Sequence, residues 1–479
     1  SSGLSKRWGI RSFFVHEKIA FSTLLWYNKK KLKLQQGENE MGIYLNPENV
    51  DFQEVLNSKI YVDKSELIQY TNSVLRTTQK YICVSRPRRF GKSMAANMLT
   101  AYYSRGCDSR ELFQGLKIAT HPNFEKHLNQ YNVIHLNMRD YLTESENMKQ
   151  LIQFVEDDLL DELQQEFSDL RMPRRKTLVK VLEQAFAQYK IPFVFIIDEW
   201  DCIFRVHKSD AASQKDYLDF LRNLLKDKSY IALAYMTGIL PIKKYGEHSA
   251  INVFYEYSMT DASPIEEFTG FTEQEVRQLC EQYNMPFSET KKWYDGYCVD
   301  GVSIYNPKSV VEAMLRGKFS NYWTQTETYE ALKIYIQSNE FGVQDVILKL
   351  LAGEKEKIDT TTFSNDMVTF ATKDDVLTLL VHLGYLTYNA ETKEIWIPND
   401  EVMEQFISTV KVMGWGSVVT ALETSEKLLQ ATLSGDEQTV AELIEQAHQA
   451  NASILKYNDE NALSCVISLA YYSAQKNYT

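Results

Sequence analysis

Residues 81–98, YICVSRPRRFGKSMAANM, decide how the rest of the chain is interpreted. The stretch begins with a short apolar strand at Tyr81–Val84, continues through a loop to FGKS at Phe90–Ser93, and is followed by residues that favour a helix. A phosphate-binding loop requires this order, because backbone N–H groups at a helix N-terminus surround the phosphates. We therefore predict a P-loop in which Lys92 reaches the β- and γ-phosphate oxygens and the Ser93 hydroxyl ligates Mg²⁺.

The loop departs from the usual pattern G-x-x-x-x-G-K-[ST] at its first position, because Arg86 stands where the first glycine would fall. Together with Arg88 and Arg89 it makes the loop strongly basic, and a basic turn before a helix is the alternative interpretation. The residues that we expect to contact the nucleotide are Arg88, Arg89, Phe90, Gly91, Lys92, Ser93 and Met94.

A second apolar strand lies in the segment Ile191–Asp201, IPFVFIIDEWD, and ends in carboxylates. Its run of β-branched and aromatic residues is typical of a parallel strand that is buried on both faces. In a Walker B strand the first acid, here Asp198, holds Mg²⁺, and the second, Glu199, orients or deprotonates the attacking water. Asp201 is the next candidate for the base, and a strand end that meets solvent is the alternative interpretation.

A third apolar strand, Tyr230–Met236, ends at Thr237, which is the candidate sensor of the γ-phosphate. An ordinary turn residue is the alternative for Thr237. The order strand–GKS–helix, then strand–DE, then strand–T is nonetheless hard to obtain by chance in one chain. We therefore predict a nucleotide site whose catalytic residues are Lys92, Asp198, Glu199 and Thr237 and whose metal ligands are Ser93 and Asp198.

Several segments together resemble one known family, the predicted AAA-ATPase-like proteins of bacteria and archaea. The similar segments are SRPRRFGKS (85–93), IIDEWD (196–201), YMTGILPI (235–242), FTGFTEQEV (268–276), WYDGY (293–297), IYNPKSV (304–310) and VLTLLVHLGYL (376–386). The resemblance runs from about Met41 to the last residue. It implies that RPRRFGKS stands in for the ordinary Walker A loop, and that a PD-(D/E)XK nuclease-like domain commonly follows at the C-terminus.

The composition excludes several classes of protein. Of 479 residues, 44% are hydrophobic and 24% charged, which is enough for two or three domains. The net charge of −12 gives no overall basic field, so any DNA contact must come from a local basic patch. The six cysteines and eight histidines are scattered, which favours a reducing cytoplasm and predicts neither a zinc site nor disulfides. No apolar run reaches transmembrane length, so we expect no membrane partner.

We predict an α/β fold: a P-loop NTPase domain with a doubly wound parallel sheet at 41–260, then a helical, winged-helix-like domain at 261–400. A helix-plus-hairpin pattern at 375–396 carries the winged-helix interpretation. Residues 401–479 are expected to be a helical linker and the start of a truncated nuclease-like domain. Residues 1–40 hold eight Lys or Arg and three Glu, and we interpret them as an upstream extension or one added for expression. A basic nucleic-acid-binding arm is the alternative.

Two further patterns predict how helices begin and pack. Asp63 and Glu66 form a D-x-x-E capping box for the helix that leads to the P-loop strand. Four leucine or valine residues at i+4 spacing predict a long helix with one buried face, and these are Leu151, Val155, Leu159 and Leu163. His382, on an apolar helix, is interpreted as a core residue.

The predicted reaction is Mg²⁺-dependent ATP hydrolysis, with ATP preferred over GTP because the chain has no guanine-reading N-K-x-D motif. The alternative is a nucleotide-gated, STAND-like switch that turns ATP over slowly and regulates a partner. A role in DNA processing, coupled to a nuclease, rests on the resemblance alone, and a homo-oligomer is a further expectation. The arginine finger stays unassigned among Arg88, Arg89, Arg174, Arg175 and Arg222.

The end of the chain bears on the nuclease expectation. Glu460 resembles the helix-borne acid of the nuclease-like domain, and the stretch Asn461–Thr479 after it contains no acid. A PD-(D/E)XK site needs further carboxylates on two following strands to hold Mg²⁺. We therefore expect no nuclease activity from this chain, and the alternative interpretation of 458–475 as a closing amphipathic helix predicts the same.

Overall fold

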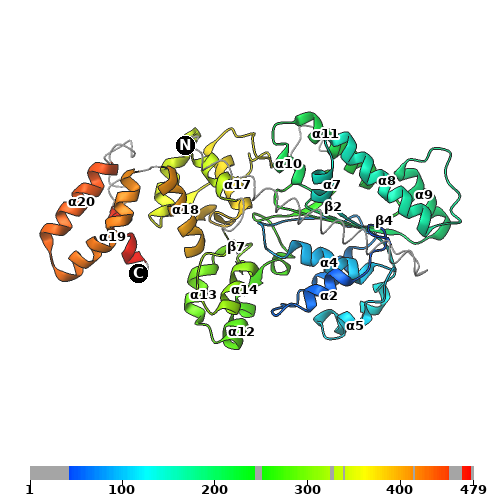
Figure 1. Ribbon diagram of the computed structural model, residues 1–479, viewed down its shortest axis with the longest axis horizontal. Helices are drawn as coiled ribbons and strands as arrows, with labels where there is room; N and C mark the ends of the chain where they lie inside the picture. The colour runs from blue at the N-terminus through cyan, green and yellow to red at the C-terminus, as the bar shows by residue number, and fades with distance from the viewer. Residues whose placement is uncertain are drawn as a thin grey trace, which may run out of the picture.

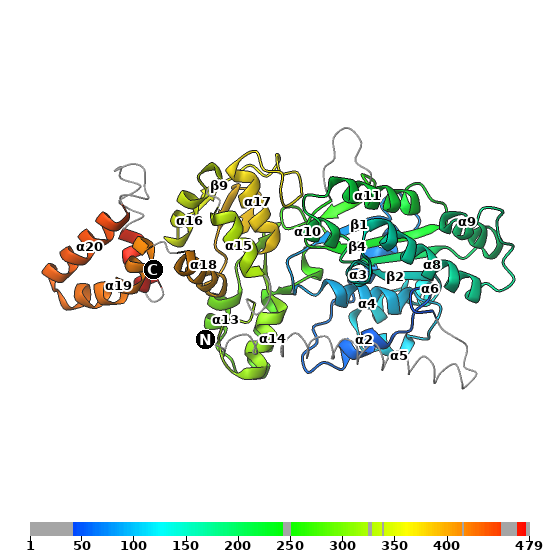
Figure 2. The same cartoon turned by 45° about the horizontal axis from the view of Figure 1, so that its top comes forward.

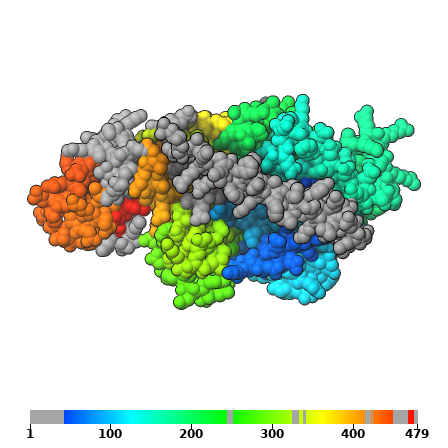
Figure 3. All heavy atoms as spheres, in the orientation of Figure 1, coloured from blue at the N-terminus to red at the C-terminus, as the bar shows by residue number. Residues whose placement is uncertain are grey.

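The computed structural model describes residues 42–242, 251–323, 328–337, 340–413, 416–451 and 467–475. The molecule is elongated, with a sheet-containing domain at one end and the helices α19 (Gly416–Ser434) and α20 (Glu437–Asn451) at the other (Figures 1 and 2). The space-filling view shows the same order along the long axis (Figure 3). The predicted extension 1–40 and the acid Glu460 lie outside the described residues.

A five-stranded sheet in the order β2-β3-β4-β1-β5 forms the centre of the first domain, and all of its neighbouring strands are parallel. Its strands are β1 (Tyr81–Ser85), β2 (Asn132–Asn137), β3 (Phe193–Asp198), β4 (Ile231–Gly238) and β5 (Tyr255–Tyr257). Every residue of β1, β3 and β4 is buried, as predicted for strands covered on both faces. The predicted α/β P-loop fold is confirmed.

Helices cover both faces of this sheet (Figure 1). They are α2 (Val50–Leu56), α3 (Leu67–Val74), α4 (Lys92–Tyr103), α5 (Arg110–Phe113), α6 (Phe124–His127), α7 (Met138–Glu144), α8 (Met148–Glu166), α9 (Leu178–Tyr189), α10 (Cys202–Val206) and α11 (Ala211–Leu225). Alternate residues of β3 enter opposite cores: Phe195 and Ile197 pack with α8, α9 and α11, whereas Val194 and Ile196 pack with α2, α3 and α4.

Two local predictions for this domain have opposite outcomes. The buried stripe of α8 is confirmed, since its four predicted core residues are fully buried. The capping box at Asp63 and Glu66 is wrong, because α3 begins after Glu66 and that side chain makes no capping bond. The Asp63 carboxylate instead accepts hydrogen bonds from the backbone N–H groups of Ser65 (2.8 Å) and Lys117 (2.7 Å), so it joins two loops.

The middle of the molecule contains two small three-stranded sheets. They have the orders β6-β8-β7 and β10-β11-β9, with antiparallel pairing throughout. The strands are β6 (Phe271–Thr272), β7 (Tyr297–Val299), β8 (Val302–Tyr305), β9 (Glu356–Lys357), β10 (Thr387–Asn389) and β11 (Glu394–Trp396). The β10–β11 hairpin was predicted, but the β6-β8-β7 sheet was not, because strands of two to four residues carry too little periodicity to be recognised.

The helices around these sheets, and those that follow, are α12 (Glu273–Tyr283), α13 (Phe287–Tyr294), α14 (Pro307–Arg316), α15 (Thr328–Gln337), α16 (Val343–Leu351), α17 (Lys373–Leu383), α18 (Asp400–Met413) and α22 (Tyr472–Gln475). A capping box between Thr272 and Glu275 starts α12, and Pro307 occupies the first turn of α14. His382 is buried in the core, as predicted. Within the part of the chain described, no helix combines the length and apolarity needed to cross a bilayer.

Candidate nucleotide-binding site

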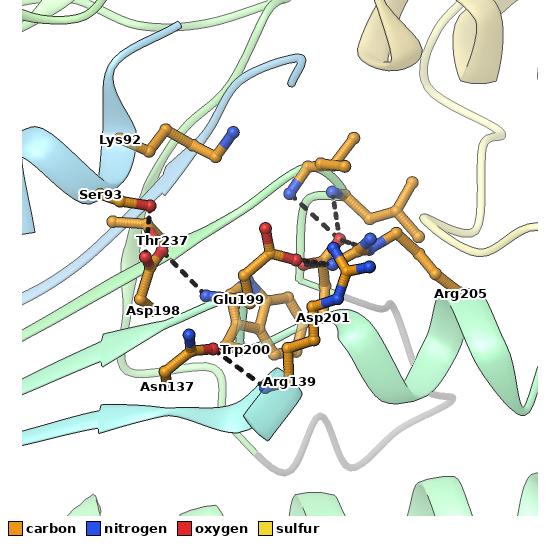
Figure 4. A network of polar contacts seen from close by, with 12 residues as sticks. Lys92, Ser93, Asn137, Arg139, Asp198, Glu199, Trp200, Asp201, Arg205 and Thr237 are labelled. Carbon is orange, nitrogen blue, oxygen red and sulfur yellow. Dashed lines mark hydrogen bonds and ion pairs between the residues drawn. The ribbon is translucent and has the colours of Figure 1, made fainter. Parts of the chain in front are cut away.

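Strand order brings the predicted site residues together. Because β4 lies between β1 and β3, Thr237 at the end of β4 is placed between the P-loop and the Walker B acid. Asp198 Oδ2 accepts a hydrogen bond from Ser93 Oγ at 2.5 Å, and its Oδ1 accepts from the Thr237 hydroxyl and from the Glu199 backbone N–H (Figure 4). Three segments far apart in the sequence thus meet on one carboxylate at the carboxyl edge of the sheet, where ligands bind in such folds.

Lys92 is buried and bends back over its own loop. Its Nζ donates to the backbone carbonyls of Arg86 (3.0 Å) and Pro87 (2.9 Å). Burial lowers the pKa of Lys92 to about 8, while the carboxylates of Glu199 and Asp198 act in the opposite direction. A phosphate in the loop would offer this ammonium stronger partners than the two carbonyls, because charge-assisted hydrogen bonds are the stronger ones.

The three loop arginines have different tasks. Arg86 is fully buried, and its Nη1 donates to the carbonyls of Ser85 and Tyr257, both at 3.0 Å, so it ties the end of β1 to the end of β5. Arg89 has a left-handed backbone (φ 69°) and its Nη1 donates to the carbonyl of Tyr322 at 3.0 Å. Arg88 and Arg89 line the cavity described below, whereas Arg86 does not.

Glu199 lies at the same edge of the sheet, directly after β3. Its backbone is left-handed (φ 55°), and its Oε2 forms an ion pair with Arg205 of α10. Burial disfavours the charged carboxylate, but the neighbouring cations Arg205 and Lys92 outweigh burial and hold the pKa of Glu199 below its usual value. The side chain is therefore an ionised carboxylate near neutral pH.

Asp201 does not qualify as the reserve base that its position after Glu199 suggested. It is fully buried and does not line the cavity. Its Oδ2 accepts from the backbone N–H groups of Ile239 (3.0 Å) and Leu240 (2.8 Å) and pairs with Arg205 Nε at 3.1 Å. Because Asp201 is buried away from the cavity and its Oδ2 carries three structural bonds, it is not placed to act on a water there.

A cavity of about 670 Å³ opens in front of these residues. Its polar lining includes the loop 88–93 with Arg139 and Glu199, and its apolar lining includes Phe52, Val55, Tyr61, Met94 and Met98. The β6 and α14 region closes one wall with Phe268, Phe271, Pro307, Lys308 and Val311. A volume of this size with both charged and apolar lining suits a nucleotide, with phosphates at the loop and the base between apolar side chains.

Sequence reasoning missed part of this lining. Phe268 and Phe271, in the segment FTGFTEQEV that was noted only for its resemblance to the family, line the cavity. Arg139 was missed although it follows the end of β2, where the rule that placed Asp198 and Thr237 would have found it. Of the arginine-finger candidates, Arg88 and Arg89 line the cavity, whereas Arg174, Arg175 and Arg222 are exposed and do not.

The donor set fits Mg²⁺. Ser93 and Asp198 present a hydroxyl and a carboxylate oxygen side by side, and hard oxygen donors that leave room for waters and phosphate oxygens are what this ion takes. A metal held by protein side chains alone is not expected here. Among the described residues, no group of three or more His, Cys, Asp or Glu could hold an ion.

The fold and this arrangement define the chain's first domain as a P-loop nucleotide-binding domain. Residues 50–246 match the AAA-ATPase-like family, described as "Predicted AAA-ATPase". This match over the P-loop part of the chain confirms the resemblance first seen in the loop and in IIDEWD. The match does not extend to a nuclease domain.

Other relatives are more distant. An "Uncharacterized protein in vnfD 5'region" of Azotobacter chroococcum mcd 1 is 24% identical over 256 residues, which cover 51% of this chain and 47% of the relative. The chain therefore spans about half the length of this curated relative. The Aeropyrum pernix ORC2 protein aligns in its ADPNP–ADP complexes with a TM-score of 0.30 and 13% identity, over 74% of this chain and 97% of that one. Its ADP form aligns with a TM-score of 0.28 and 10% identity, over 74% and 94%. Likenesses this loose support no conclusion about function.

Proposed function

We propose that this protein binds ATP with Mg²⁺ and hydrolyses it to ADP and phosphate. The observation that carries the proposal is the meeting of Ser93, Thr237 and Glu199 on Asp198. Of the site residues, Lys92, Ser93 and Glu199 line the cavity, whereas Asp198 and Thr237 are buried behind them. The apolar side chains of the lining would take the adenine base. No guanine-reading N-K-x-D motif is present in the sequence, which favours ATP over GTP.

Each residue of the site has a role in this reaction. Lys92 exchanges its two loop carbonyls for β- and γ-phosphate oxygens. Ser93 and Asp198 would hold Mg²⁺, which neutralises phosphate charge when bound. The Oε1 atom of Glu199 accepts a proton from water while the water oxygen bonds to the γ-phosphorus, and the bond to the β–γ bridging oxygen breaks with its electron pair leaving on ADP. Thr237 is fully buried and does not line the cavity, so its role here is to hold Asp198 in place through its hydroxyl.

A second candidate, a slow nucleotide-gated switch, is favoured by the way in which the middle of the chain holds the loop. The backbone N–H of Gly270 donates to the Phe90 carbonyl at 3.0 Å, the Phe90 and Tyr297 rings meet edge to face at 5.2 Å, and Arg89 bonds the Tyr322 carbonyl. Nucleotide binding would act directly on these contacts. Turnover at ~1–100 per second supports the enzyme, whereas minutes per turnover supports the switch.

The finer parts of the proposal rest on the resemblance and on the residue pattern. They are the domain limits 41–260, 261–400 and 401–479, a winged-helix-like middle domain, DNA as a partner through a local basic patch, and a homo-oligomer. DNA-dependent and nucleotide-dependent changes in the sedimentation of the purified chain test the last two.

Lys92→Ala tests the central proposal. We expect loss of ATP binding and of phosphate release, because Lys92 is the cation that the motif directs to the β- and γ-phosphates. Equilibrium dialysis with ATP and a phosphate-release assay with and without Mg²⁺ measure both effects. Lys180→Ala is the matched control, since Lys180 is an exposed lysine of α9 paired with Glu183. Wild-type hydrolysis by the Lys92 variant would refute the assignment.

A further inference from the structure

Arg205 is a largely buried arginine that lies outside the nucleotide-binding motifs. It lies on α10, four residues after Asp201, with only 10% of its side chain exposed. Its guanidinium lies between two carboxylates, bonding Glu199 Oε2 through Nη2 and Asp201 Oδ2 through Nε at 3.1 Å (Figure 4). It is not among the residues that line the cavity, so it is not placed to contact a phosphate itself.

Arg205 is fixed from behind by the backbone. Asp201 is fully buried, and the oxygen that bonds Arg205 Nε also accepts from the N–H groups of Ile239 and Leu240, directly after β4. The guanidinium therefore has a set position relative to the end of β4, where Thr237 lies. A planar fork held by one carboxylate presents its remaining N–H groups in a defined direction.

The bond to Arg205 holds Glu199, the candidate base, through Oε2 and leaves Oε1 available. Glu199 lines the cavity, and within the described residues its Oε1 has no hydrogen-bond partner. A carboxylate fixed through Oε2 points the lone pairs of Oε1 in one direction, which is the geometry that a base needs toward a water in the cavity. The other charged groups around Glu199 are Lys92, Asp198, Asp140 and Arg139, and the structure gives none of them a side-chain bond to it.

We propose that Arg205, anchored by Asp201 to the backbone after β4, is the positioning residue that holds Glu199 toward the attacking water. The proposal rests on the proposed ATPase function. It also explains why two acids follow the Walker B strand at a spacing of two: Glu199 acts on the water, and Asp201 secures the arginine that aims it.

The test compares the turnover number and the ATP dissociation constant of Arg205→Gln, Arg205→Lys, Glu199→Gln and the double variant Arg205→Gln/Glu199→Gln. We expect Arg205→Gln to lose roughly 10- to 100-fold in kcat, as a misplaced catalytic group does, with a Kd for ATP within about twofold of the wild type. Arg205→Lys should recover part of the loss, because one ammonium can pair with Glu199 but cannot also keep the fork on Asp201. The double variant should be no slower than Glu199→Gln.

Arg110→Gln is the matched control, because Arg110 is an exposed arginine that pairs with Glu125 and does not line the cavity. Unchanged or faster turnover in Arg205→Gln, or losses in the two single variants that multiply in the double variant, would overturn the proposal. If Arg205→Gln does not fold, Arg205→Lys carries the test, and wild-type kcat in that variant would overturn it. A wild-type protein that does not hydrolyse ATP refutes the ATPase function, whereas an active protein indifferent to Arg205 refutes only the positioning role.

Discussion

Glu199, the candidate base, has a left-handed backbone and a partly buried, ionised carboxylate, and both features cost stability. Its left-handed backbone is unfavourable for a residue with a side chain, typically by ~1 kcal/mol or more. Its carboxylate is partly buried, yet the cations around it keep it ionised. The bond to Arg205 and the hydrogen bond from the Glu199 backbone N–H to Asp198 hold the residue in this conformation and offset both costs.

Glu199→Gln should keep ATP bound while slowing its hydrolysis by ~10²–10⁴-fold, the usual loss when a general base is removed. The amide preserves the size of the side chain and still accepts a hydrogen bond, but it does not take a proton from water. Single-turnover phosphate release and ATP binding measured on the same preparation separate the two effects. Glu183→Gln, on the exposed face of α9, is the control. Normal turnover would assign the base elsewhere.

Glu401 is a second buried carboxyl, placed behind the loop. Its Oε1 accepts from Ser309 Oγ (3.0 Å) and from the backbone N–H groups of Tyr322 (2.7 Å) and Trp323 (2.9 Å). The Tyr322 carbonyl in turn accepts from Arg89 of the P-loop. Burial raises the pKa of Glu401 to about 7, although these hydrogen bonds act to lower it.

A carboxyl whose pKa is raised by folding stabilises the fold fully below its unfolded pKa of about 4.3, and that contribution is lost as the pH rises through about 7. Glu401→Gln should therefore be more stable than the wild type at pH 8, by up to ~3 kcal/mol, and close to it at pH 4.5. Urea unfolding at both pH values measures the difference. Glu442→Gln, which changes an exposed side chain of α20, is the control. Equal effects of Glu401→Gln at both pH values would show that Glu401 does not titrate differently in the fold.

At the scale of single residues, the motif residues could be predicted from the sequence, but the residues that hold them in place could not. Lys92, Ser93 and Asp198 follow from local spacing, because phosphate and metal chemistry dictates which side chains follow a strand or open a helix. Arg205 and Glu401 act through contacts that depend on packing, and a single sequence does not reveal which of its many charged residues are buried.

Among the elements, α17 shows how the middle of the chain meets the P-loop. The helix ends at Gly384, which has a left-handed backbone (φ 85°), and the space where a Cβ would stand is 2.8 Å from Pro87 Cβ and 2.9 Å from Pro87 Cγ. The Tyr297 hydroxyl also donates to the Gly384 carbonyl at 2.9 Å. The end of α17 therefore presses directly on the loop that precedes Lys92.

Gly384→Ala should lower both the melting temperature and the affinity for ATP, because the added methyl group meets the rigid Pro87 ring and pushes the loop. Gly435→Ala is a close control: it has a similar backbone (φ 74°) but nothing within 4 Å of the added Cβ. Both variants place an alanine in a left-handed conformation, so the difference between them reports the contact with Pro87. Thermal melting with and without ATP measures that difference. Equal loss of ATP affinity in both would show that the contact with Pro87 does not matter.

The elements also show where sequence patterns are informative. The strands β1, β3 and β4 and the helix α8 were predictable because long apolar runs and i+4 stripes are strong signals. The two-residue strand β6 gave no such signal, and its pairing with β8 depends on residues more than thirty positions away. The aromatic residues of this cavity wall could be read in the sequence, but their place in a wall built on β6 could not be predicted from it.

For the whole molecule, the cavity belongs to two parts of the chain at once. The P-loop domain provides the phosphate end, and Phe268, Phe271 and Val311 from the middle region provide one wall. A bound nucleotide should therefore slow amide hydrogen exchange in 81–98 and also in 268–271 and 307–311. Exchange in α20, at the far end of the molecule (Figure 1), should not change. Protection confined to 81–98 would show that the middle region does not enclose the ligand.

A cavity lined by two parts of one chain affects how long a nucleotide stays bound as well as how tightly it binds. A nucleotide seated between the loop and the β6–α14 wall would lose part of its contacts whenever that wall moved back, so we expect its dwell time to depend on how often the two parts separate. A partner that bound beside α14 and displaced the wall would then speed nucleotide release without touching a phosphate contact. A partner that held the two parts together would instead lengthen the time for which a nucleotide stays bound.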